Sequence, residues 1–117
     1  MTKAVIYHNP RCSKSRQTLA LLEDNSVDFD TVLYLDTPPT PAELTSILQK
    51  LKISARELLR KGEDDYKQLN LADPTKTDAE LIAAMVAHPK LIERPIVIVG
   101  DKAVLGRPPE NVLELIK

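Results

Sequence analysis

The chain contains a single cysteine, Cys12, and its neighbours are polar or cationic. It stands in the stretch HNPRCSKSRQTL, where a β-rich run gives way to a run with helical spacing. A thiol at the first turn of a helix meets unpaired backbone N–H groups and the positive end of the helix dipole, which favour the thiolate. Arg11, Lys14, Arg16 and His8 lie close in sequence and could lower the thiol pKa further. The residues predict a nucleophilic thiolate, because a cysteine that only packs is expected within an apolar run.

The same stretch excludes several chemistries. A site of the protein-tyrosine-phosphatase kind needs an arginine six residues after the cysteine, and position 18 is threonine. A dithiol oxidoreductase carries Cys-x-x-Cys, whereas Ser15 occupies the second cysteine position here. Any redox reaction therefore needs a second thiol from another molecule. We expect no metal site, because a lone cysteine and the widely separated His8 and His88 do not have the spacing of metal ligands.

Three arginines, Arg60, Arg94 and Arg107, stand at the boundaries of expected elements, and the last two precede prolines. Guanidinium groups present forked donors that suit a tetrahedral oxyanion, and they stay charged at any working pH. A thiolate needs such cations to approach an anion, because two unit charges about 4 Å apart cost about 4 kcal/mol at an effective dielectric of about 20. In a thioredoxin-like sheet, a cis Arg94–Pro95 bond would direct these residues at Cys12.

The elements that must position these residues follow from the apolar pattern and the turn residues. Strands are predicted at 3–8, 28–35, 95–99 and 102–106, and helices at 13–25, 41–51, 55–60, 78–88 and within 107–116. Arg60 would end the helix at 55–60, and the polar, turn-rich stretch 61–76 is predicted to be a connector rather than a separate domain. Three capping boxes mark helix starts, namely Thr40 with Glu43, Ser54 with Glu57, and Thr77 with Glu80.

The element order is β-α-β, then helices, then β-β-α. A right-handed crossover makes the first two strands parallel neighbours, and Gly100-Asp101 predicts a tight hairpin between the last two. This is the order of an α/β fold, a thioredoxin-like mixed sheet with a helical insertion between the second and third strands. An unrelated α+β sandwich stays open from element order alone. The length predicts a single domain, 1–117, with the helical insertion at about 40–93.

Composition excludes other classes of protein. With 16 basic and 17 acidic residues, the chain has no net field that would attract nucleic acid or an acidic membrane. No segment approaches the roughly 20 apolar residues of a membrane helix, and the early apolar run is too short for a secretory signal. We therefore expect a cytoplasmic protein that binds neither nucleic acid nor membrane.

Four stretches resemble the glutaredoxin-dependent arsenate reductase family, over nearly the whole chain. They are YHNPRCSKSRQTL, LLRK around Arg60, ERPIVIV around Arg94 and GRPPENVL around Arg107. The resemblance implies a thioredoxin-like fold with a helical insertion. It also implies that Cys12 attacks arsenate, while Arg60, Arg94 and Arg107 hold the oxyanion.

The resemblance further implies roles for two residues of the cysteine loop and for two outside thiols. His8 would help to keep the thiol ionised, and Ser15 would support the thiolate. Glutathione, a co-substrate rather than a bound cofactor, would attack the thiol-bound arsenate. Glutaredoxin would then reduce the mixed adduct so that arsenite leaves. The single cysteine agrees with this scheme, because both further thiols come from other molecules.

Three alternatives stay open at this point. The chain could act on another oxyanion or thiol adduct instead of arsenate. It could be a redox-responsive adaptor of RNA polymerase, although such regulators typically carry Cys-x-x-Cys and Ser15 argues against this switch. It could also be a glutaredoxin-like protein that only exchanges thiols with glutathione.

Overall fold

The computed structural model describes residues 3–116, so residues 1–2 and Lys117 of the predicted domain lie outside the described part. Contacts divide the chain into two compact units. Unit 1 joins Met1–Thr37 to Arg94–Lys117, and unit 2 is Pro38–Glu93. Unit 2 therefore begins and ends close to the predicted limits of the helical insertion. That the two units form one domain stays a prediction.

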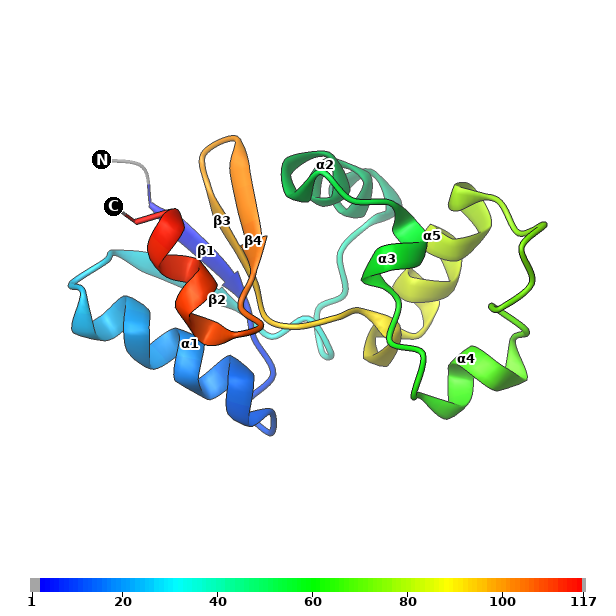
Figure 1. Ribbon diagram of the computed structural model, residues 1–117, viewed down its shortest axis with the longest axis horizontal. Coiled ribbons are helices and arrows are strands. Elements are labelled where there is room, and N and C mark those ends of the chain that lie inside the picture. Colours follow the sequence, from blue (N-terminus) through cyan, green and yellow to red (C-terminus); the bar gives the residue numbers. More distant parts are fainter. Residues whose placement is uncertain (1–2, 117) are drawn as a thin grey trace. The chain divides into compact units, whose positions relative to one another are not determined.

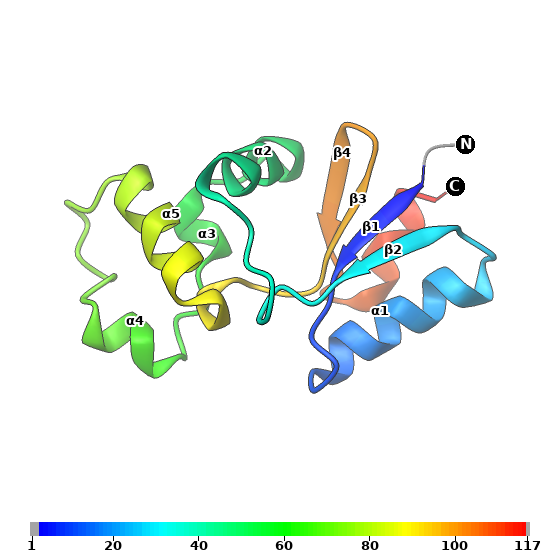
Figure 2. The ribbon, with the colours of Figure 1, turned by 180° about the vertical axis from the view of Figure 1, so that it is seen from behind.

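Unit 1 is built on a four-stranded mixed sheet with the order β2-β1-β3-β4. The strands are β1 (Ala4–Tyr7), β2 (Phe29–Val32), β3 (Ile96–Val99) and β4 (Lys102–Leu105). β1 pairs in parallel with β2, while β3 runs antiparallel to both β1 and β4. Figures 1 and 2 show the sheet from opposite sides. The predicted parallel pair is confirmed.

One face of this sheet is covered by two helices. Both views place α1 (Ser13–Asp24) and the 3-10 helix η2 (Pro109–Glu114) on the same side of the strands (Figures 1 and 2). The core cluster of this unit joins two alternate residues of β1 to one buried residue each from α1, β3 and η2, and consists of Ala4, Ile6, Leu22, Val97 and Val112. Apolar burial of this kind contributes about 25 cal/mol per Å² and fixes α1 against the sheet.

β3 and β4 form the predicted tight hairpin. The two strands are joined by Gly100 and Asp101, and Gly100 has a positive φ of 62°. That conformation is readily open to glycine because it has no Cβ. The hairpin returns the chain from β3 to a point where Gly106 and Arg107 follow β4.

Unit 2 contains helices α2 (Pro41–Leu51), α3 (Ala55–Leu58), α4 (Asp64–Gln68) and α5 (Asp78–Ala87), and the 3-10 helix η1 (Pro89–Leu91). All three predicted capping boxes are present, at the N-termini of α2, α3 and α5. In each one the hydroxyl accepts from the third helical N–H, and the glutamate accepts from the cap residue's own N–H. The α/β class and the insertion between β2 and β3 are thus as predicted.

The helix predicted at 55–60 is shorter than expected, and this is a correction. α3 ends at Leu58, so Arg60 lies two residues beyond the helix instead of at its end. The backbone explains the difference, because the N–H of Arg60 donates to the carbonyl of Leu91 at 2.8 Å and Leu59 forms a β-bridge with Ile92. Long-range pairing therefore replaces the next helical turn.

Two further predictions of extent were wrong. The second strand was expected at 28–35 but ends at Val32, because the N–H groups of Asp36 and Thr37 both donate to the carbonyl of Leu33 and form a turn. The connector 61–76, in which no helix was expected, contains the short helix α4. Asp64 and Asp65 stand in its first turn, where acidic side chains favour a helix. Within residues 3–116, no helix is long and apolar enough to cross a bilayer.

Candidate functional site

The cysteine lies at the N-terminus of α1, as predicted. Cys12 is the N-cap residue of that helix, with extended backbone angles and 9% of its surface exposed. The strand β1 delivers the chain to this point, and a turn from Asn9 to Cys12 closes with the Cys12 N–H donating to the Asn9 carbonyl at 3.0 Å. The thiol is therefore held at the positive end of a three-turn helix, in a loop of fixed shape.

Several opposing effects act on the thiol. Its partial burial disfavours the charged form, but the backbone N–H groups of Ser15 and Lys14 and the guanidinium of Arg94 stabilise the thiolate. The net result is that the pKa of Cys12 is lowered from its ordinary value. Arg94 is the cationic side chain that contributes to this shift. Nearby Arg16 acts on His8 instead.

The side chains of His8 and Ser15 form a buried hydrogen bond across the cysteine loop. The Ser15 hydroxyl lies 2.6 Å from His8 Nδ1 and accepts a hydrogen bond from the backbone N–H of Asn9 at 3.0 Å. All three residues are buried. Burial, and then the charge of Arg16, lower the pKa of His8, so its imidazole is neutral at neutral pH. The Ser15 hydroxyl therefore connects α1 to the end of β1, while the Ser15 backbone N–H is among the groups that lower the Cys12 pKa. The roles expected of His8 and of Ser15 toward the thiolate stay predictions.

Two of the three predicted oxyanion-binding arginines lie in the same unit as the thiol. Arg94 precedes β3 and Arg107 follows β4, and both are followed by cis prolines. The Arg107 Nη1 donates to the Arg94 carbonyl at 3.4 Å. The hairpin thus joins the two arginines, and Arg94 also reaches the thiol of Cys12. Their predicted role toward an oxyanion is not tested by this geometry.

Arg60 belongs to unit 2 and is held by two carboxylates. Its Nε lies 3.4 Å from Glu63 Oε2, and its Nη1 lies 3.0 Å from Glu93 Oε1. The Arg60 side chain is 22% exposed. Its Nη2 donates no hydrogen bond to any residue in the range 3–116. These two ion pairs hold the guanidinium within unit 2, and its role toward an oxyanion stays a prediction.

Sequence reasoning missed three residues that shape the site. Asn9 accepts the Arg11 backbone N–H on its side-chain oxygen at 3.0 Å, and an asparagine before a proline is a turn signal that could have been used. Thr18 is fully buried and donates to the carbonyl of Lys14 at 2.9 Å, with the carbonyl of Gly106 at 3.5 Å. A Cβ on Gly106 would collide with the Thr18 side chain and lie 2.7 Å from Pro95 Cγ.

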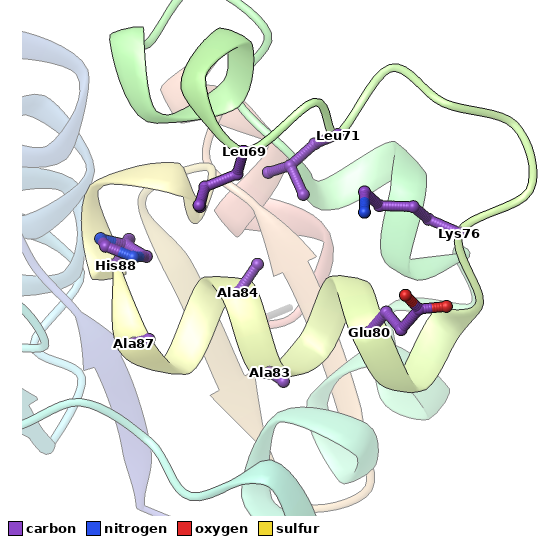
Figure 3. Close-up of a pocket in the computed structure, with 8 residues that line it drawn as sticks. All are labelled: Leu69, Leu71, Lys76, Glu80, Ala83, Ala84, Ala87 and His88. Carbon is purple, nitrogen blue, oxygen red and sulfur yellow. The ribbon is translucent and has the colours of Figure 1, made fainter.

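Unit 2 contains a groove of its own. It has a volume of about 390 Å³, lies along α5 and contains Leu69, Leu71, Lys76 and His88 among its lining residues (Figure 3). His88 Nδ1 lies 3.8 Å from Asp65 Oδ2. Within the described part of the chain, no cluster of three or more histidine, cysteine or acidic residues could hold a metal ion.

This chain is similar over nearly its whole length to proteins of known sequence and structure. The model of the ArsC family matches residues 7–115. The uncharacterized protein YfgD of Escherichia coli (strain K12) is 58% identical over 99% of both chains. An arsenate reductase of Haemophilus influenzae is 51% identical over 96% of this chain and 97% of its own length. A solved structure of an arsenate reductase from Vibrio cholerae has a TM-score of 0.94 and 51% identity, and the match covers 97% of each chain.

Proposed function

Because this chain belongs to the ArsC family, we propose that it reduces arsenate to arsenite with Cys12 as the nucleophile. The observation that carries the proposal is the contact of Arg94 with the thiol of Cys12, whose pKa is lowered. A cation at the nucleophile both stabilises the thiolate and neutralises an approaching oxyanion. Arsenate, a tetrahedral anion, fits the forked donors of such a side chain.

In the first step, the Cys12 sulfur attacks arsenic and one arsenate oxygen leaves as water. The arsenic–sulfur bond replaces an arsenic–oxygen bond, so arsenic stays pentavalent. Because Cys12 attacks as the thiolate, both protons of the departing water come from dihydrogen arsenate. Arg94 and Arg107 would hold the remaining oxygens, and Arg60 would contribute through Nη2, which its two carboxylates leave free for a ligand.

The reduction then needs two thiols from outside, because the chain has one cysteine. The first, glutathione, displaces a second oxygen as water and forms another arsenic–sulfur bond. The second, a cysteine of glutaredoxin, attacks the glutathione sulfur and forms a disulfide. The electron pair of the broken arsenic–sulfur bond stays on arsenic, which becomes trivalent. Water then displaces Cys12, and arsenite leaves with the thiol regenerated.

A component-omission assay tests this function. The full chain is incubated with arsenate, and arsenite is measured with glutathione and glutaredoxin together, with each alone and with neither. We expect sustained turnover only with both thiol donors. Arsenite formation no faster than in the protein-free control, with both donors present, would contradict the proposal. A bound cofactor is not required, and a cytoplasmic location stays a prediction.

A further inference from the structure

A groove of about 310 Å³ adjoins the cysteine loop in unit 1. One wall is formed by residues 8–11, which immediately precede Cys12, and the other by Leu33, Leu35 and Asp36. The second wall is the turn that ends β2, so the groove lies between the ends of two neighbouring parallel strands. Its volume is at the lower end of the range of about 300–1,000 Å³ typical of small-molecule sites.

The groove has an apolar wall that the chain leaves open to solvent. Leu33 is 42% exposed and Leu35 is 36% exposed, and only Leu69 of unit 2 is a comparably exposed large hydrophobic residue within 3–116. Isolated exposed leucines are ordinary, but these two line the same concave site beside the nucleophile. The wall therefore offers contact for the apolar part of a ligand.

Opposite charges flank this apolar wall. Arg11 contributes a guanidinium and Asp36 a carboxylate, and both residues are exposed. Neither side chain makes an ion pair or hydrogen bond with another residue of the described range. Both charges are thus available to a ligand, and together they are complementary to a small molecule that carries a carboxylate and an ammonium group.

The position of the groove separates it from the arginines. In the sheet, β1 lies between β2 and β3. The end of β2 supplies the groove, whereas Arg94 stands before β3 and contacts the thiol of Cys12. If the oxyanion binds with Arg94, a thiol that attacks it can approach from the β2 side without displacing that arginine.

We propose that this groove binds the body of the thiol co-substrate, a small zwitterionic peptide thiol such as glutathione. A carboxylate of the peptide pairs with Arg11, its ammonium group pairs with Asp36, and its apolar atoms contact Leu33 and Leu35. Arg11 is adjacent to Cys12, and a tripeptide spans at most about 10 Å, so its thiol reaches the adduct at Cys12 from this position. This inference rests on the proposed function, which requires an external thiol.

Direct binding is measured by NMR titration of the full chain, carrying Cys12→Ser, with S-methylglutathione, which cannot exchange thiols. We expect saturable shifts of the backbone amides of residues 8–11 and 33–36 at millimolar ligand. Shifts confined to other residues, or no saturable shift, would overturn the assignment. This readout does not depend on turnover, so it stands even if the chain fails to reduce arsenate.

Kinetics test the two charges separately. Arg11→Glu and Asp36→Lys should each raise the KM for glutathione about three- to tenfold, the range expected for loss of a partly exposed ion pair. The matched controls Lys102→Glu and Asp101→Lys reverse exposed charges at the β3–β4 hairpin and should leave this KM unchanged. Normal turnover with the same KM for glutathione in all four variants would overturn the assignment of this groove to glutathione, while the proposed function would stand. No turnover in the wild type would instead contradict the function.

Discussion

The Ser15 hydroxyl lies 2.6 Å from His8 Nδ1, and the same oxygen accepts the backbone N–H of Asn9 at 3.0 Å. One side chain on α1 thereby satisfies two groups at the end of β1, and all three residues are buried. The sequence places this serine where a dithiol enzyme has its second cysteine. In this protein the hydroxyl at that position connects α1 to the end of β1.

Replacing this hydroxyl should destabilise the fold. Ser15→Ala leaves the Asn9 N–H and His8 Nδ1 without their partner in a buried site, which costs about 1–3 kcal/mol. Urea unfolding followed by circular dichroism measures the free energy of unfolding. Ser13→Ala, at an exposed neighbouring position, is the control and should change it little. Equal stability of both variants would show that the pair contributes nothing.

The lowered pKa of His8 predicts a loss of stability in acid. In the unfolded chain the pKa of His8 is about 6.5, and burial lowers its pKa in the folded chain below that value. Between the two values the unfolded state binds more protons, so the free energy of unfolding falls as the pH drops through this window. His8→Gln should flatten the dependence below about pH 6.5, as measured by urea midpoints. An unchanged slope in His8→Gln would refute the assignment.

Arg94 should affect both ionisation and oxyanion chemistry. Arg94→Ala removes the cation that stabilises the thiolate, so the pKa of Cys12 should rise, measured from the pH dependence of alkylation by iodoacetamide. Arsenate turnover should fall about 10²- to 10³-fold, the usual effect of losing one preorganised charge donor.

Arg107→Ala provides the contrast for this test. Arg94 is the arginine shown to lower the Cys12 pKa, so the alkylation profile of Arg107→Ala should stay closer to that of the wild type than the profile of Arg94→Ala, while arsenate turnover falls. Simple thiol exchange with glutathione should persist in both variants. Parallel loss of exchange and arsenate turnover would instead favour a thiol-exchange protein without oxyanion chemistry.

Local signals predicted much of this architecture, and long-range contacts account for most of what they missed. The three capping boxes depend on residues three positions apart, so the sequence was sufficient for them. The helix expected through Arg60 ended early because Leu91, far along the chain, takes its backbone N–H. No local sequence pattern predicts a hydrogen-bond partner so far along the chain.

At the site, too, local sequence signals predicted some features and long-range contacts account for those that were missed. The nucleophile at a helix N-terminus follows from the β-to-α change around Cys12, and the contact with Arg94 follows from the expected position of an Arg-Pro pair before a strand. The approach of Thr18 to Gly106 joins residues 88 positions apart, and threonine at position 18 carried no signal of it. The Glu93 carboxylate at Arg60 was missed for the same reason, because it lies 33 positions away.

The close approach of Gly106 to α1 yields a further prediction. Gly106→Ala places a Cβ against the Thr18 side chain and 2.7 Å from Pro95 Cγ, so the hairpin end or α1 must shift. Such overpacking costs about 1–3 kcal/mol, measured by urea unfolding. Gly62→Ala is the control, because a Cβ there meets nothing within 4 Å. Equal stability of the two variants would mean that the contact is not tight in solution.

The central claim, that the thiol of Cys12 attacks arsenate, is tested most directly by arsenite formation in the Cys12→Ser variant with glutathione and glutaredoxin present. Sulfur and oxygen are close in size, so the fold should persist, which circular dichroism checks. A hydroxyl at this helix end stays protonated at neutral pH and is a weak nucleophile. The account predicts a fall in turnover of at least about 10³-fold. Turnover within a few fold of the wild type would contradict it.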